Sequence, residues 1–277
     1  DPAKVAEAEK RAKEADLNIV VAGEYMMRFR WTDRTDGEDT DRSDLDLVGL
    51  QNELIRKVAA SGKPTILILV NGRPLGVEWA AQHLPVIVEA WAPGMYAGQA
   101  VAEILYGKVN PSAKLAITIP RSVGQLQMIY NHKPSQYFHP YAVKPSTPLW
   151  PFGYGLSYTT YKYDDLKLSA KEVSQNQNVE VSVKVTNTGQ RDGVEIVQLY
   201  IRDKYSSVTR PVKELKDFAR VALKAGESKV VTFTITPDKL AFYDKKMKWI
   251  VEPGEFVVMA GASSADESLL KETFILK

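Results

Sequence analysis

Short apolar runs alternate with amphipathic stretches through the first 120 residues. The runs predict strands at 17–22, 65–70, 85–90 and 115–119. Apolar residues at helical spacing predict helices at 1–16, 47–61, 77–82 and 98–106. The run at 65–70 is almost continuously apolar, which is typical of a strand covered on both faces. Strands that alternate with helices predict an α/β domain with a largely parallel sheet over residues 1–120.

The period of the pattern changes to two from about residue 159. Apolar and polar residues alternate strictly from Val179 to Val185, and further short runs follow at 194–201, 218–223, 230–235, 249–251, 256–260 and 273–276. About seven short strands within roughly 115 residues predict a β-sandwich over residues 159–277. The chain has no cysteine, so the disulfide of antibody domains is absent and a fibronectin type III-like sandwich is the better match.

Residues 121–158 form neither pattern. This segment holds five prolines among many aromatic side chains. Proline blocks regular elements, whereas the aromatic residues indicate that the segment packs on a neighbouring surface. We therefore expect a connecting segment that is ordered.

Composition narrows the functional classes. A net charge of +2 over 277 residues gives no case for nucleic acid or an anionic membrane, and no apolar run approaches the ~20 residues that span a bilayer. The three histidines are scattered, and the acidic residues miss the spacing of an EF-hand, so we expect neither a metal nor another cofactor.

A long polar loop follows the first predicted strand. It carries eight carboxylates, four arginines and one large aromatic residue, Trp31; the carboxylates are Glu24, Asp33, Asp36, Glu38, Asp39, Asp41, Asp44 and Asp46. Ligands of open α/β sheets bind beyond the carboxyl ends of the strands, where this loop begins. The loop is therefore either a functional loop or a solvated segment whose charges neutralise one another.

Several motifs occur in the order found in one enzyme family. They are NGRP at 71–74, WAPG at 91–94, GKVNPS at 107–112, PRSVG at 120–124, PFGYGLSY at 151–158, VTNTG at 185–189 and RPVKEL at 210–215. The chain thereby resembles the C-terminal part of glycoside hydrolase family 3, and most closely the bacterial periplasmic β-glucosidases. The resemblance implies three modules in the whole protein: an N-terminal barrel, an α/β sandwich and a type III-like sandwich. It also implies a retaining mechanism whose nucleophile lies in the barrel, of which this chain shows no motif.

The resemblance also selects candidate residues. Glu38 stands four residues before Arg42, the spacing of the family's acid/base glutamate, and so carries over as the catalytic residue. Glu24 matches a glutamate at the strand end, which we expect to support the loop together with Arg42. Trp31 is the candidate for stacking on a sugar, with packing inside the loop as the alternative. Arg73 is expected to tie the loop rather than contact substrate.

Two functions remain open from the sequence. The first is the C-terminal part of an exo-acting β-glucosidase that is periplasmic or secreted, supplies the acid/base loop and depends on the N-terminal barrel. The second is a non-catalytic module that binds carbohydrate or a protein partner, and β-xylosidase specificity is a further alternative. A helix at the very start indicates a piece of something longer. Retaining catalysis needs two carboxylates and only the acid/base candidate is present, so we expect the chain alone to be inactive. We also expect a mobile segment at 25–43 and an exposed apolar sheet edge or face, and homodimer formation stays open.

Overall fold

The computed structural model describes residues 1–24, 34–135 and 142–277. The α/β part contains the helices α1 (Pro2–Glu14), α2 (Gln51–Ala59), α3 (Glu78–His83) and α4 (Ala97–Leu105), and the strands β1 (Asn18–Gly23), β2 (Thr65–Val70) and β3 (Val86–Glu89). These elements match the helical and strand periodicities of the first 106 residues, with ends shifted by a few positions. A short 3₁₀ helix follows at Val123–Gln125.

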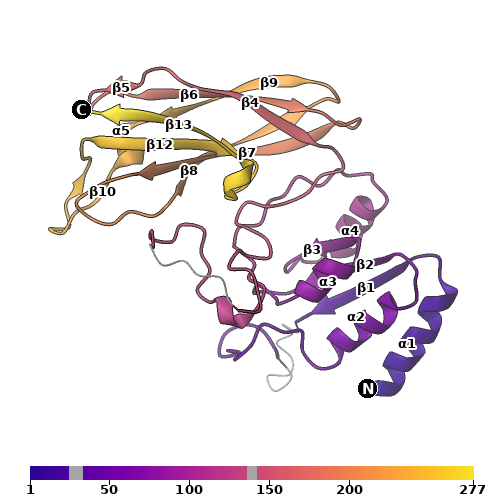
Figure 1. The fold of residues 1–277 in the computed structure, drawn as a ribbon. Coiled ribbons are helices and arrows are strands. Elements are labelled where there is room, and N and C mark those ends of the chain that lie inside the picture. Colours follow the sequence, from indigo (N-terminus) through magenta and orange to yellow (C-terminus); the bar gives the residue numbers. More distant parts are fainter. Residues whose placement is uncertain (25–33, 136–141) are drawn as a thin grey trace. The chain divides into compact units, whose positions relative to one another are not determined.

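The three strands form one parallel sheet in the order β1-β2-β3. Helix α2 packs on β1 and β2, α1 packs on α2, and α3 packs on β3 (Figure 1). The core between sheet and helices is built from side chains such as Val20, Ile55, Leu67 and Leu69, all of them buried. Because the strands run in the same direction, their carboxyl ends meet at one edge of the sheet. The predicted α/β fold with a parallel sheet is confirmed.

The predicted strand at 115–119 is wrong. These residues pair instead with an irregular segment further along the chain: Leu115 N–H donates to the carbonyl of Tyr154 at 2.8 Å, and Leu149 N–H donates to that of Ile119 at 2.9 Å. The apolar pattern indicates burial, but Pro120 ends the run, and its backbone groups bond to residues 149 and 154 instead of to a strand.

The second half of the chain is a β-sandwich. Its strands are β4 (Tyr161–Leu168), β5 (Glu172–Val173), β6 (Val179–Asn187), β7 (Gly193–Asp203), β8 (Glu214–Leu223), β9 (Ser228–Ile235), β10 (Phe242–Tyr243), β11 (Trp249–Ile250), β12 (Gly254–Gly261) and β13 (Leu269–Leu276). One sheet has the order β5-β13-β12-β7-β8, the other has the order β4-β6-β9, and β10 pairs with β11. The inward residues of β6 face those of β7 and β12, so the valines at alternate positions of Val179–Val185 are all buried, as their period of two predicts.

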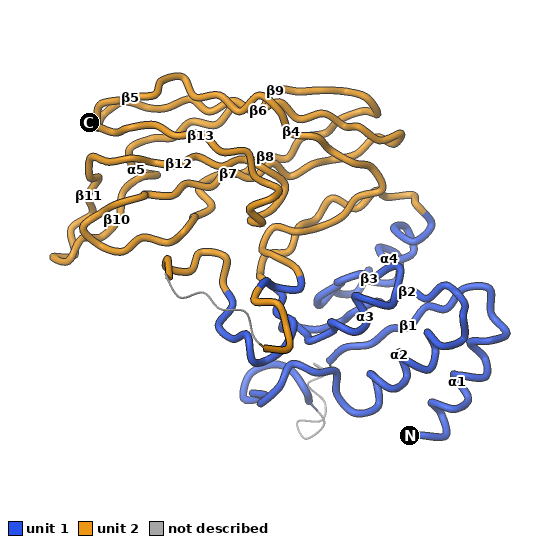
Figure 2. Tube along the Cα trace, viewed as in Figure 1, with its two compact units in different colours: residues 1–106, 119–128, 147–149 blue, residues 107–118, 129–146, 150–277 orange. Residues whose placement is uncertain are grey.

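Two compact units emerge from this arrangement (Figure 2). Unit 1 contains residues 1–106, 119–128 and 147–149; unit 2 contains residues 107–118, 129–146 and 150–277. Part of the connecting segment is packed within unit 2, where the Tyr130 ring stacks on Phe152 with ring centroids 4.3 Å apart. In the described residues, no helix combines the length and apolar character that crossing a bilayer requires.

Candidate active site at the carboxyl edge of the parallel sheet

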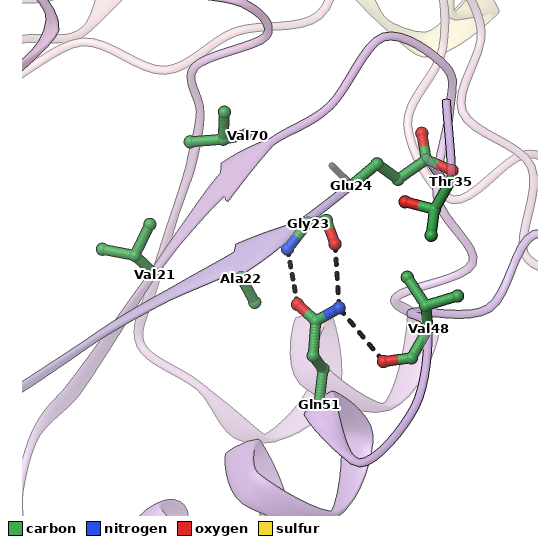
Figure 3. A pocket seen from close by; sticks show the side chains of 8 residues that line it. All are labelled: Val21, Ala22, Gly23, Glu24, Thr35, Val48, Gln51 and Val70. Atoms are coloured by element: carbon green, nitrogen blue, oxygen red, sulfur yellow. Dashed lines mark hydrogen bonds between the residues drawn. The ribbon is translucent and has the colours of Figure 1, made fainter. Parts of the chain in front are cut away.

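The end of β1 is fixed by close backbone packing. Gly23 has a φ of 145°, and a Cβ at this position would collide with the carbonyl of Val70 on β2. Gln51, at the start of α2, donates to the Gly23 carbonyl and accepts from its N–H, and it also donates to the Val48 carbonyl (Figure 3). The first and last residues of the loop are therefore held together by one side chain.

Glu24 is a buried carboxylate between two arginines. Its side chain is 0% exposed; Arg42 Nη1 donates to Glu24 Oε1 at 3.1 Å, and Arg73 Nε lies 3.2 Å from both carboxylate oxygens. Arg42 also donates to Asp44 Oδ1 and to the carbonyl of Asp46, each at 2.6 Å. A buried carboxylate requires such partners, since an unpaired charge in the interior is strongly unfavourable.

Glu38 lies at the tip of a short turn, residues 35–40, which we call the Glu38 turn. Gly37 and Asp39 have positive φ angles of 105° and 58°, which reverse the chain direction at this point. Asp36 Oδ1 accepts from Gly37 N–H at 2.8 Å, and Thr40 Oγ1 donates to the Glu38 carbonyl at 3.2 Å. The Glu38 side chain is exposed and forms no hydrogen bond or ion pair with the described residues.

A second, half-buried acid lies at the same edge of the sheet. Glu89, at the end of β3, accepts from Trp91 N–H at 3.1 Å, and Asn71 Nδ2 lies 3.5 Å from its other oxygen. Burial raises the pKa of Glu89 to about 7. Its carboxyl group is hydrogen-bonded to Trp91, whereas the carboxylate of Glu38 has no partner among the described residues.

An open hollow of about 270 Å³ lies at the end of β1. It is lined by Val21, Ala22, Gly23, Glu24, Thr35, Val48, Gln51 and Val70 (Figure 3). Glu38 does not line this hollow, and the lining is mainly apolar with few donors for sugar hydroxyls. The Glu38 carboxylate therefore does not belong to this hollow.

The structure thus brings Glu24 and Arg42 together in an ion pair, and Glu38 pairs with neither of them. Trp31 and the first part of the predicted mobile segment lie outside the described residues. Of that segment the structure describes residues 34–43, which make the contacts given above. Among the described residues, no group of three His, Cys, Asp or Glu side chains is placed to hold a metal ion.

Comparison with known proteins decides the family. The family model described as the glycosyl hydrolase family 3 C-terminal domain matches residues 2–158, and a fibronectin type III-like domain matches residues 195–264. The chain belongs to glycosyl hydrolase family 3. The family 3 chain is 43% identical to a β-xylosidase of Formosa agariphila and 40% identical to the periplasmic β-glucosidase of Salmonella typhimurium. These matches cover 98% and 95% of the chain.

Solved structures agree with this assignment. A β-glucosidase from Erythrobacter marinus is 41% identical and superposes with a TM-score of 0.91, and one from Listeria innocua in complex with glucose is 32% identical with a TM-score of 0.89. Both matches cover 100% of this chain but only 37% and 38% of those chains. The curated relatives are covered to 37% and 35%, so the family 3 chain spans just over a third of the length of the proteins it matches.

Sequence reasoning missed three residues that shape the site. The sequence places Gln51 in a helix, Asp36 among many loop carboxylates and Asn71 in a turn motif, and singles out none of the three. Asn71 is fully buried and donates to the carbonyl of Arg73 at 2.8 Å, and Asp36 is buried as well. The pair Asn71-Gly72 was the local signal here, because an asparagine before glycine in a turn often hydrogen-bonds nearby backbone groups.

Proposed function

We propose that this family 3 chain is the C-terminal part of a retaining, exo-acting β-glucosidase and that Glu38 is its acid/base residue. The observation that carries the proposal is an exposed carboxylate, unpaired among the described residues, on a turn at the carboxyl edge of a parallel sheet. In retaining hydrolysis one carboxyl group protonates the leaving oxygen and later activates water, while a second attacks the sugar. Glu38 takes the first role, and the nucleophile belongs to the N-terminal barrel of the whole protein.

The arrangement of the other charges supports this division of roles. Glu24 is saturated by Arg42 and Arg73 and is closed to solvent, so it supports the loop and does not exchange protons with substrate. Trp31 stays the candidate for stacking on the sugar. We keep residues 1–120, 121–158 and 159–277 as the proposed domain boundaries, and the periplasmic relative supports a periplasmic or secreted location.

The test is Glu38→Gln in the full-length enzyme. Hydrolysis of alkyl β-glucosides should fall by roughly 10²–10⁴-fold, because their leaving groups need protonation. Aryl glucosides with activated leaving groups should form the glycosyl-enzyme at a nearly unchanged rate. Azide should then speed turnover: it attacks the anomeric carbon without base assistance and displaces the enzyme carboxylate.

Asp41→Asn is the matched control, since Asp41 is another exposed carboxylate of the same loop. This variant should hydrolyse both alkyl and aryl glucosides at the wild-type rate. If Glu24→Gln gives the azide-rescued pattern and Glu38→Gln behaves like the wild type, the assignment of Glu38 is wrong.

The preferred sugar is a separate question. A relative that is 43% identical is named a β-xylosidase, which makes β-xylosidase activity the second candidate. The ratio of kcat/KM for p-nitrophenyl β-glucoside and β-xyloside in the full-length enzyme decides between them. A ratio in favour of the xyloside would replace the glucosidase assignment and leave the role of Glu38 intact.

A further inference from the structure

Arg73 binds both ends of the Glu38 turn. Its Nη2 donates to the Thr40 carbonyl at 2.9 Å and lies 3.4 Å from the Thr35 carbonyl. The same nitrogen donates to Asp36 Oδ1 at 3.0 Å. Residues on either side of Glu38 are therefore connected through one guanidinium group, which comes from the end of a different strand.

The Asn71-Gly72-Arg73 segment is shaped to receive this turn. Asn71 is fully buried and bonds the Arg73 carbonyl, which fixes the backbone that carries the arginine. A Cβ on Gly72 would collide with the Asp36 carboxylate, so the glycine makes room for the approach of Asp36. Asp36 is buried and also accepts from Gly37 N–H, next to the catalytic position.

Glu24 sets the orientation of the guanidinium. It contacts Arg73 through Nε, which leaves Nη2 directed at the turn. Since Arg42 also pairs with Glu24, the buried carboxylate keeps a partner without Arg73. The contacts of Arg73 with Thr35, Asp36 and Thr40 are therefore separable from the neutralisation of Glu24.

We infer that Arg73 is the positioning residue of Glu38, acting through the two carbonyls and the carboxylate that bracket the turn. This inference rests on the proposed function of Glu38. A planar guanidinium presents its donors in a fixed fork, whereas a lysine offers one flexible point charge. Loss of the fork lets the turn shift, and a displacement of about 1 Å of a catalytic group can cost 10²-fold in rate.

The experiment compares Arg73→Lys with wild type in the full-length enzyme. We expect kcat for alkyl β-glucosides to fall on the order of 10²-fold with KM nearly unchanged. Activated aryl glucosides should still form the glycosyl-enzyme, which also shows that the variant is folded, and azide should accelerate their turnover. If Arg73 had a purely structural role, the substitution would lower the rates for alkyl and aryl glucosides together, and azide would not accelerate turnover.

Two controls are matched to the structure. Arg121 also bonds one carboxylate, Glu78 at 3.1 Å, and one backbone carbonyl, Thr147 at 3.0 Å, so Arg121→Lys tests the loss of a similar guanidinium elsewhere in unit 1. Gly72→Ala displaces Asp36 without touching Arg73 and should reproduce the Arg73→Lys pattern. Gly98→Ala, where an added Cβ meets nothing within 4 Å, should behave like the wild type.

The outcomes separate this inference from the proposed function. If Glu38→Gln shows the leaving-group dependence and azide rescue while Arg73→Lys and Gly72→Ala do not, the positioning role is refuted and Glu38 stands. An identical defect in Arg121→Lys would also refute it. If Glu38→Gln itself behaves like the wild type, the proposed function fails first.

Discussion

Glu24→Gln separates the two leading glutamates by stability rather than by activity. The substitution keeps the size of the side chain but removes the charge that lies between Arg42 and Arg73. One oxygen of the amide can still accept, while its NH₂ group faces a cation. We expect a marked loss of stability in unit 1, in contrast to Glu38→Gln, whose side chain is exposed and unpaired among the described residues.

The magnitude follows from burial and partners. Removing one member of a buried ion pair costs about 3–5 kcal/mol. Here both arginines keep another carboxylate, Asp44 and Asp36 respectively, which places the loss at the lower end, about 3 kcal/mol. Glu78 offers a comparison, because its side chain pairs with Arg121 at 3.1 Å and is 15% exposed, whereas that of Glu24 is closed to solvent; Glu78→Gln should cost less, about 1 kcal/mol.

Native-state hydrogen exchange is the assay, because a chain with two units need not unfold in one transition. The amides that join β1 and β2 should lose roughly 10²-fold in protection in Glu24→Gln and less than about tenfold in Glu78→Gln and Glu38→Gln. Equal protection in Glu24→Gln and Glu78→Gln would refute the view that Glu24 stabilises the root of the loop.

Three further results are expected. Burial raises the pKa of Glu89 to about 7, above its ordinary value of 4.5. The contribution of Glu89 to stability is therefore complete below pH 4.5 and is lost as the pH rises towards 7. In Glu89→Gln, the free energy of unfolding of unit 1 should vary with pH by about 1–2 kcal/mol less, after allowance for solvent screening. Lys114→Met should destabilise unit 2 in urea by about 3 kcal/mol, because among the described residues it leaves the buried Glu195 carboxylate only the Tyr163 hydroxyl as a partner. Adding Glu195→Gln should recover most of the loss. Residues 1–277 alone should hydrolyse p-nitrophenyl β-glucoside no faster than their Glu38→Ala variant, since retaining catalysis needs two carboxylates.

The apolar/polar period predicted those strands in which burial alternates regularly from one residue to the next. Val179–Val185 alternates in the sequence and alternates in burial, because β6 packs one face on the opposite sheet. β4 escaped prediction: Asp164 and Asp165 interrupt its alternation where the structure has a register shift, and Asp165 adopts a φ of 53°. A bulge changes which face a residue occupies, so a strict period of two cannot detect such a strand.

In the candidate site, too, short sequence patterns predicted some features, whereas contacts between residues far apart in the sequence were not predictable. The spacing from Glu38 to Arg42 is a local signal and was available in the sequence. Arg73 contacts residues 33 to 49 positions away, and the need for glycine at position 72 arises from Asp36. Contacts of that range depend on the strand order, which no short pattern encodes. The sequence therefore predicted a loop with a candidate acid and a tie from Arg73, whereas the contacts of Arg73 with Thr35, Asp36 and Thr40 required the fold.

One face of the parallel sheet exposes apolar side chains. Ile19, Val21 and Val86 lie on this face and are 50%, 63% and 41% exposed, while the opposite face is covered by helices. Apolar surface of this kind is covered in stable proteins. Because the relatives are nearly three times longer, we expect their remaining chain to supply the cover in the full-length enzyme.

Val21→Lys tests this expectation in two contexts. In residues 1–277 the lysine should be tolerated and should weaken any self-association measured by sedimentation, because it stays in water. In the full-length enzyme it should cost several kcal/mol, since a charge would be buried without a partner. Val230→Lys, on the exposed face of β9, should be nearly neutral in both. If Val21→Lys is as harmless as Val230→Lys in the full-length enzyme, this face is open to solvent there, and the apolar pattern of β1 has another cause.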